Sequence, residues 1–220
     1  LLGADMGYVP DGVDPWEGLE PHWREFCENN ALGRKAPVLL APVRLTPRKN
    51  LELAVEIVAE MRRLGREAVL LITGPGDPHN PQFKEYGGKL LKLARERGAE
   101  LHILTWELGP IEDPKPWLGA ADALLLTSRM EGFGLPAVEA ALARLPALLS
   151  DIPPLKEVAG PNALFFSLDE EPRSVAERAL RFLEENPAYR ARRRALEEYS
   201  WEAVYEKHIK PLIAFPQPGL

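Results

Sequence analysis

The chain has 220 residues, of which 45% are hydrophobic and 27% are charged, and its formal net charge is -6. This balance is typical of a globular protein, and no apolar run approaches the roughly 18 residues of a membrane-spanning helix. The negative charge argues against an extended nucleic-acid surface, although it leaves room for a local basic site that binds a small phosphate ligand. The single cysteine, Cys27, excludes an internal disulfide and a cysteine-rich zinc site. We therefore expect a cytoplasmic protein.

Residues 1–35 carry turn signals such as "PDG" and "NN" but little sustained periodicity. The chain begins with neither an initiator methionine nor a signal peptide. We therefore interpret 1–35 as an interdomain segment or amino-terminal extension of a protein fragment.

Residues 36–199 alternate between short apolar runs and amphipathic stretches. The runs are "PVLLAPV" (37–43), "EAVLLIT" (67–73), "AELHILT" (99–105), "ADALLLTS" (121–128), "PALLS" (146–150) and "NALFFSL" (162–168). Helices are expected after Asn50, a candidate N-cap, over 83–98 and from about Pro136. This order predicts a doubly wound, Rossmann-like parallel sheet, in which ligands bind beyond the carboxyl ends of the strands.

The loop after the fourth run, "SRMEGFGLPAVEA" (128–140), has the features of a ligand site. Its glycines permit close backbone approach, and Pro136 is placed to open a helix, so the amides of Phe133, Gly134 and Leu135 are expected to face an anion. Glu131 and Glu139 would place two carboxylates at different depths of one pocket. The alternative is an ordinary turn with two solvated acids.

A second polar cluster follows the first run. Arg44 and Lys49, five residues apart in "RLTPRKN", present two cations at the same edge of the predicted sheet. Two fixed cations can neutralise a diphosphate without a metal ion, because arginine binds phosphate through paired hydrogen bonds and lysine acts as a point charge. The alternative is a pair of solvated turn residues.

Together the two clusters resemble the carboxyl-terminal, donor-binding half of retaining GT-B glycosyltransferases of group 1, the superfamily of glycogen synthase-like and sucrose synthase-like enzymes. "VPDGVD" (9–14) resembles the interdomain segment before that half, and "SDIPPLKEVAG" (150–160) resembles a downstream strand and loop. The resemblance implies that Arg44 and Lys49 hold the diphosphate of a nucleotide sugar, as catalytic residues together with Glu131. It also implies that Glu131 and the backbone of residues 132–135 (Gly132, Phe133, Gly134 and Leu135) hold the sugar, and that Glu139 binds the ribose.

The same resemblance implies the partners of the chain. The substrate would be a nucleotide-diphosphate sugar, its base would lie near Leu101 to Trp106, and no metal or other cofactor would be needed. A facing amino-terminal domain would supply the acceptor site, so the chain alone is expected to be inactive. Residues 200–220, with Ser200 as a candidate N-cap, would form the helix that crosses back towards that domain. The absence of a spanning segment leaves room for peripheral membrane contact by the full protein.

Other interpretations have less support in the sequence. A non-catalytic module that binds sugar nucleotide or phosphate, and a GT-B sugar-nucleotide epimerase, would share the architecture. "GPGDPHN" has His79 where a dinucleotide-binding fingerprint needs glycine. The four histidines lack ligand spacing. We expect packing roles for Trp106 and Trp117, with stacking on a ligand as the alternative. We expect a solvated helix face for the charged run from Arg190 to Glu198.

Overall fold

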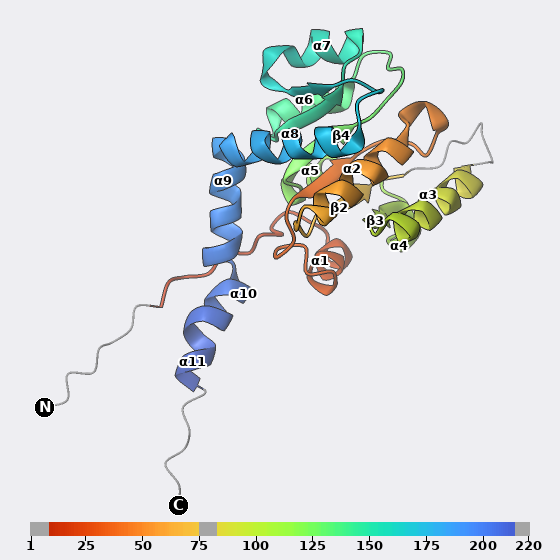
Figure 1. Cartoon of the computed structure of the whole chain (residues 1–220). Helices are drawn as coiled ribbons and strands as arrows, with labels where there is room; N and C mark the ends of the chain where they lie inside the picture. Colours follow the sequence, from red (N-terminus) through yellow and green to blue (C-terminus); the bar gives the residue numbers. More distant parts are fainter. Residues whose placement is uncertain (1–8, 75–82, 214–220) are drawn as a thin grey trace, which may run out of the picture.

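The centre of the protein is one parallel sheet. The structure, a computed structural model, describes residues 9–74 and 83–213. The sheet has the order β3-β2-β1-β4-β5-β6. Helices surround it (Figure 1). Its strands are β1 (Val38–Ala41), β2 (Val69–Ile72), β3 (Glu100–Ile103), β4 (Ala123–Leu126), β5 (Ala147–Ser150) and β6 (Leu164–Phe166). Each of the six apolar runs forms a strand, so the predicted doubly wound α/β fold is confirmed.

The sheet order reverses between β1 and β4. From β1 the chain builds outwards through β2 and β3, returns to place β4 on the other side of β1, and continues outwards through β5 and β6. β1 pairs in parallel with β2 through Val38 and Val69, and with β4 through Leu39 and Ala123. All four residues of β1 are buried, as expected for a central strand covered on both faces. The carboxyl ends of β1 and β4 therefore form the switch point, where sheets of this kind bind ligands.

Helices cover both faces of the sheet. Because crossovers between parallel strands are right-handed in nearly all proteins, the helices that connect β1 to β3 and those that connect β4 to β6 are expected on opposite faces. On the first face α2 packs against both α3 and α8, and on the second α6 packs against α7. The helices are α1 (Pro21–Asn29), α2 (Leu51–Arg63), α3 (Phe83–Arg97), α4 (Leu104–Glu107), α5 (Pro116–Ala120), α6 (Leu135–Leu142), α7 (Pro153–Ala159), α8 (Pro172–Glu185), α9 (Pro187–Arg194), α10 (Trp201–Val204) and α11 (Lys210–Ile213).

Helix α1 was not predicted. It buries Trp23, Phe26 and Cys27, and the rings of Trp23 and Phe26 lie 5.4 and 5.9 Å from the ring of Trp117 on α5. Trp117 is fully buried, so its predicted packing role is confirmed. Part of the amino-terminal segment therefore belongs to the same hydrophobic core as the sheet.

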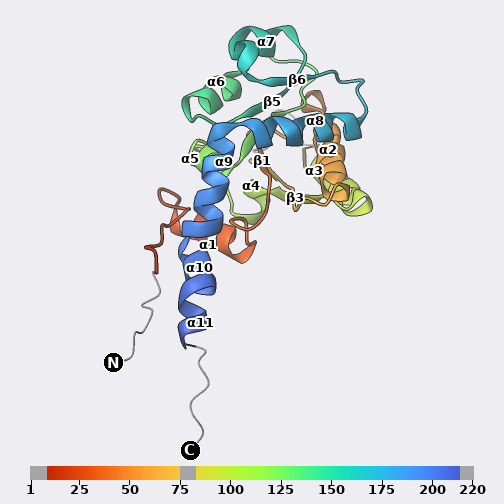
Figure 2. The same cartoon turned by 60° about the vertical axis from the view of Figure 1, so that its left-hand side comes forward.

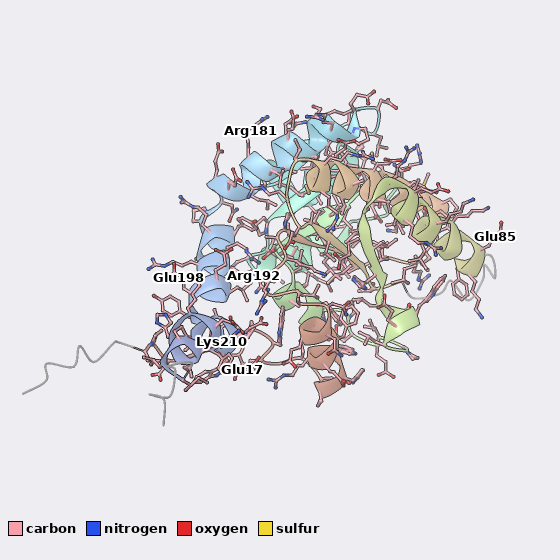
Figure 3. The ribbon with its side chains drawn as sticks, turned by 60° about the horizontal axis from the view of Figure 1, so that its bottom comes forward. Glu17, Glu85, Arg181, Arg192, Glu198 and Lys210 are labelled. Carbon is pink, nitrogen blue, oxygen red and sulfur yellow. The ribbon has the colours of Figure 1, made fainter. Side chains whose placement is uncertain are left out.

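Helices α9 to α11 extend from one side of the body, as both cartoon views show (Figure 2). A solvated face over Arg190 to Glu198 was expected, and this is wrong for two of its arginines. Arg193 is buried and donates to the carbonyl of Lys35, and Arg192 donates to the buried carboxylate of Asp122 at 3.1 Å. Figure 3 shows Arg192 between α9 and the body. We call α9 to α11 the arm, and these two arginines bind its first helix to the sheet domain.

The predicted cap at Ser200 is confirmed, because its hydroxyl accepts a hydrogen bond from the amide of Ala203 at 3.1 Å. The amino-terminal segment contacts the chain at the same point. The amide of Val13 donates to the carbonyl of Tyr199 at 2.7 Å, and the amide of Trp201 donates to the carbonyl of Val13 at 3.1 Å. Beyond α10 a π-helical segment, Tyr205–Ile209, leads into α11. None of the helices in ranges 9–74 and 83–213 is long and apolar enough to cross a membrane.

A charged cluster lies at the β3 edge of the sheet. His102 lies 3.2 Å from the carboxylates of both Glu100 and Glu107, and Glu100 also contacts Lys35 at 2.5 Å and Arg62 at 3.4 Å. Burial lowers the pKa of His102, but hydrogen bonds and charge from Glu107 and Glu100 outweigh it, so the pKa lies above its ordinary value of 6.5. The cluster joins β3 to α4 and to the chain before β1.

This cluster predicts a pH-dependent stability. Because the folded state raises the pKa of His102, the stabilisation is complete below the unfolded pKa of about 6.5 and is lost as the pH rises through the folded value. The free energy of unfolding, measured with urea between about pH 6 and pH 8, should fall less in His102→Gln than in the wild type. His22→Gln, which changes a solvent-exposed histidine, is the control. Equal pH slopes for wild type and His102→Gln would contradict the assignment.

Candidate functional site

Two loops meet at the switch point. The first runs from the end of β1 through a short 3₁₀ turn, η1 (Pro47–Lys49), to α2, and the second runs from β4 to α6. Because β1 and β4 are neighbouring parallel strands, both loops leave the same edge of the sheet. The two polar clusters singled out in the sequence are therefore adjacent in the fold.

An ion pair joins the two loops. Lys49 Nζ lies 2.5 Å from Glu131 Oε1, and the two side chains are only 9% and 8% exposed. The hydroxyl of Ser128 donates to the same carboxylate oxygen at 2.6 Å. In low-dielectric surroundings a charge is stable only when it is paired and hydrogen-bonded, and each of these two charges has its counter-charge here. The site thus holds a lysine and a glutamate in one fixed arrangement.

The end of β4 also holds the backbone of the first loop. The hydroxyl of Thr127 lies 2.9 Å from the carbonyls of both Lys49 and Asn50, and the amide of Arg129 donates to the carbonyl of Arg48 at 2.8 Å. Asn50 precedes α2 as predicted, but its side chain does not cap the helix. Its Oδ1 accepts instead from Arg129 Nη2 at 2.8 Å. These bonds fix the turn that carries Lys49.

Gly134 sets the direction of α6. Its φ of +92° is in the left-handed region, and a Cβ built on it would lie 2.7 Å from Leu155 Cδ2, so glycine is required here. Pro136 is the second residue of α6 rather than the first, and its missing N–H still lies within the first turn, where the amides have no helical partner. Within the described chain no group accepts a hydrogen bond from the amides of residues 132–135. These amides are available to an anion.

Among the described residues, no ion pair or side-chain hydrogen bond joins the other predicted residues to Lys49 or Glu131. Arg44 is exposed and Glu139 is half-buried, and neither has an ion-pair partner within 9–74 and 83–213. Phe133 and Leu135 are exposed, at 61% and 56%. The structure thus brings Lys49 and Glu131 into contact but shows no contact between Arg44 and Glu139.

The region expected to hold a base is built from β3 and α4. Thr105 Oγ1 donates to the carbonyl of Gly74 at 2.6 Å, which fixes the end of β3 against the end of β2. Trp106 packs on α3, since a Cβ on Gly87 would lie 2.4 Å from its ring. The packing role predicted for Trp106 is therefore confirmed, although 40% of its surface is exposed. His79 and most of "GPGDPHN" lie outside the described residues.

Other features of the molecule lie away from this edge. A cavity of about 460 Å³ is lined by Trp16, Cys27 and Trp201 and lies between the amino-terminal segment and the arm. Within the described ranges no three His, Cys, Asp or Glu side chains are grouped in a way that could hold a metal ion.

Sequence reasoning gave no role to Thr127, Ser128 or Arg129, although the last two open the loop that it singled out. All three follow β4 directly, and Thr127 and Ser128 are almost fully buried despite being polar. Their position at the end of a switch-point strand was the available signal.

Comparison with known proteins places this chain in a family. The fold resembles half of solved GT-B glycosyltransferases: Anabaena Alr3699/HepE in complex with UDP and glucose (TM-score 0.62, 17% identity, 94% of this chain and 56% of that one) and WaaG, involved in lipopolysaccharide biosynthesis (TM-score 0.59, 19% identity, 94% and 56%). Residues 24–200 match the family of glycosyl transferases group 1. The chain belongs to this family, as the resemblance in the sequence predicted.

Curated relatives are more similar to this chain in sequence, and they are longer than it. The serotype-specific mannosyltransferase WbdA of Escherichia coli is 28% identical over 96% of this chain, and the MMP alpha-(1->4)-mannosyltransferase of Mycolicibacterium hassiacum is 30% identical over 76% of it. The matched region is 22% of the length of WbdA and 42% of the length of the second enzyme.

The geometry of the glycine loop gives a prediction for folding. Gly134→Ala should lower the free energy of unfolding by about 1–3 kcal/mol, because alanine would be strained at a positive φ and would collide with Leu155. Gly132→Ala is the matched control, since a Cβ at Gly132 has no heavy atom within 4 Å. Urea unfolding measures both. A Gly134→Ala variant as stable as Gly132→Ala would show that the loop conformation is not constrained in this way.

Proposed function

We propose that this chain is the donor-binding half of a retaining glycosyltransferase that uses a nucleoside-diphosphate sugar. The observation that carries the proposal is the Lys49–Glu131 pair at the switch point, beside the free amides at the start of α6. Membership of the glycosyl transferases group 1 family supports it. Because two of the relatives are mannosyltransferases by name, a mannosyl donor is the first to test.

The proposed roles follow from charge. Lys49, and Arg44 when it turns inwards, bind the diphosphate and stabilise the negative charge that develops as the nucleoside diphosphate leaves. The amides of residues 132–135 and the α6 dipole add positive potential at the same place. Glu131 accepts hydrogen bonds from the hydroxyls of the sugar, and Glu139 accepts them from the ribose. Fixed cations and amides supply this stabilisation from the chain's own residues.

Binding of a nucleoside diphosphate without metal tests the site. Calorimetry in EDTA should detect binding of GDP or UDP, and Lys49→Ala should weaken it about tenfold to a hundredfold, since a hydrogen bond to a charged group contributes about 1.5–3 kcal/mol. Arg48→Ala removes a neighbouring exposed cation and should bind like the wild type. The double variant Lys49→Ala/Glu131→Gln removes both charges, so it tests whether an unpaired Glu131 is responsible for the loss. Binding that requires magnesium would contradict the proposal.

Transfer tests the assignment of the reaction. The chain alone should transfer sugar at a negligible rate, because an acceptor must be held at the anomeric carbon and water excluded by a facing domain. The full protein should form a first product with the anomeric configuration of the donor, which proton NMR of a reaction with GDP-mannose or UDP-glucose would show. An inverted first product would overturn the retaining assignment. Efficient transfer by residues 1–220 would show that no facing domain is needed to hold the acceptor.

A further inference from the structure

The two oxygens of Glu131 have different surroundings. Oε1 accepts from both Lys49 Nζ, at 2.5 Å, and Ser128 Oγ, at 2.6 Å. No group in the described ranges donates to Oε2. A carboxylate oxygen has two lone pairs, so internal donors occupy Oε1 while Oε2 keeps its capacity for a ligand hydroxyl.

The two donors to Oε1 differ in mobility. Lys49 has a flexible four-carbon side chain with three donors, so its ammonium group can turn to a new partner. Ser128 is 1% exposed and is the second residue after β4, and its carbonyl accepts from the buried hydroxyl of Ser150 at 2.7 Å. The short side chain of Ser128 is therefore fixed by the end of the sheet. Its single proton is donated to Glu131.

We propose that Ser128 is a positioning residue, which holds the Glu131 carboxylate in place for the donor sugar when Lys49 changes its partner to the diphosphate. This inference rests on the proposed function. When a diphosphate attracts Lys49, Glu131 loses its counter-charge inside a nearly buried site. Without Ser128 the carboxylate would have no internal donor and would follow Lys49 away from the sugar. With Ser128, Oε1 stays anchored and Oε2 stays oriented.

A positioning role for Ser128 affects binding of the sugar nucleotide but not binding of the free nucleotide. Ser128→Ala should leave the affinity for free GDP and UDP within about twofold of wild type, because Ser128 does not contact the diphosphate. The affinity for GDP-mannose or UDP-glucose should fall about tenfold or more, since the sugar loses its oriented acceptor. Calorimetry gives the ratio of the sugar-nucleotide constant to the nucleotide constant. A loss of stability alone would not change this ratio.

Three further variants keep the test independent of folding. Ser128→Cys keeps the shape of the side chain at a slightly larger volume but has a weak donor, so it should behave like Ser128→Ala even if alanine fails to fold. Ser128→Thr keeps the hydroxyl and should restore the wild-type ratio. Ser200→Ala removes a different buried serine, on the arm, and should lower the melting temperature without changing the ratio.

The outcomes are distinct. A wild-type ratio in both Ser128→Ala and Ser128→Cys, or an equal loss of nucleotide and sugar-nucleotide binding in them, would overturn the role of Ser128 and leave the proposed function standing. Failure of the wild-type chain to bind GDP, UDP and both sugar nucleotides would overturn the proposed function itself, and the role of Ser128 with it.

Discussion

The parallel pairing of β1 with β4 is the constraint on which the site depends. In the sequence β2 and β3 come between these two strands, yet in the sheet β1 and β4 lie side by side, with Leu40 opposite Leu124. Their loops must leave one edge together, and this places Lys49 against Glu131, 82 positions away in the sequence. The hydrophobic core thus fixes the polar site: burial of β1 and β4 on both faces determines where the charges lie.

The ion pair gives the site a stable electrostatic state. Two largely buried charges neutralise one another, and the hydrogen bonds of Thr127, Ser128 and Arg129 hold both loops around them. A bound diphosphate would compete with Glu131 for the ammonium group of Lys49. Binding of an anion and release of the carboxylate are therefore coupled in our account, and the coupling connects the phosphate end of a donor to its sugar end.

The sequence predicted the features that depend on local pattern. Continuous apolar runs such as 38–41 indicate buried strands, and the helical spacing after Asn50 indicates α2. Helix α1 was missed because its buried residues, Trp23, Phe26 and Cys27, alternate with charged ones in a short segment. The burial of Arg193 depends on contacts with Gly33 and Lys35, about 160 residues earlier in the chain, which no local pattern contains. The sequence places Lys49 and Glu131 at the same edge of the sheet, but it does not predict their direct contact. The role of Ser128 became visible only in the structure, through its hydrogen bond to Glu131.

The central claim is that Lys49 exchanges Glu131 for the diphosphate of a donor. A crystal structure of the chain with GDP or UDP, grown in the presence of EDTA, tests it directly. Our account predicts diphosphate oxygens within hydrogen-bond distance, roughly 3 Å, of Lys49 Nζ and of the amides at the start of α6, with Glu131 still bonded to Ser128. A nucleotide bound elsewhere, or bound at this edge with the Lys49–Glu131 pair intact and no phosphate contact to Lys49, would contradict it.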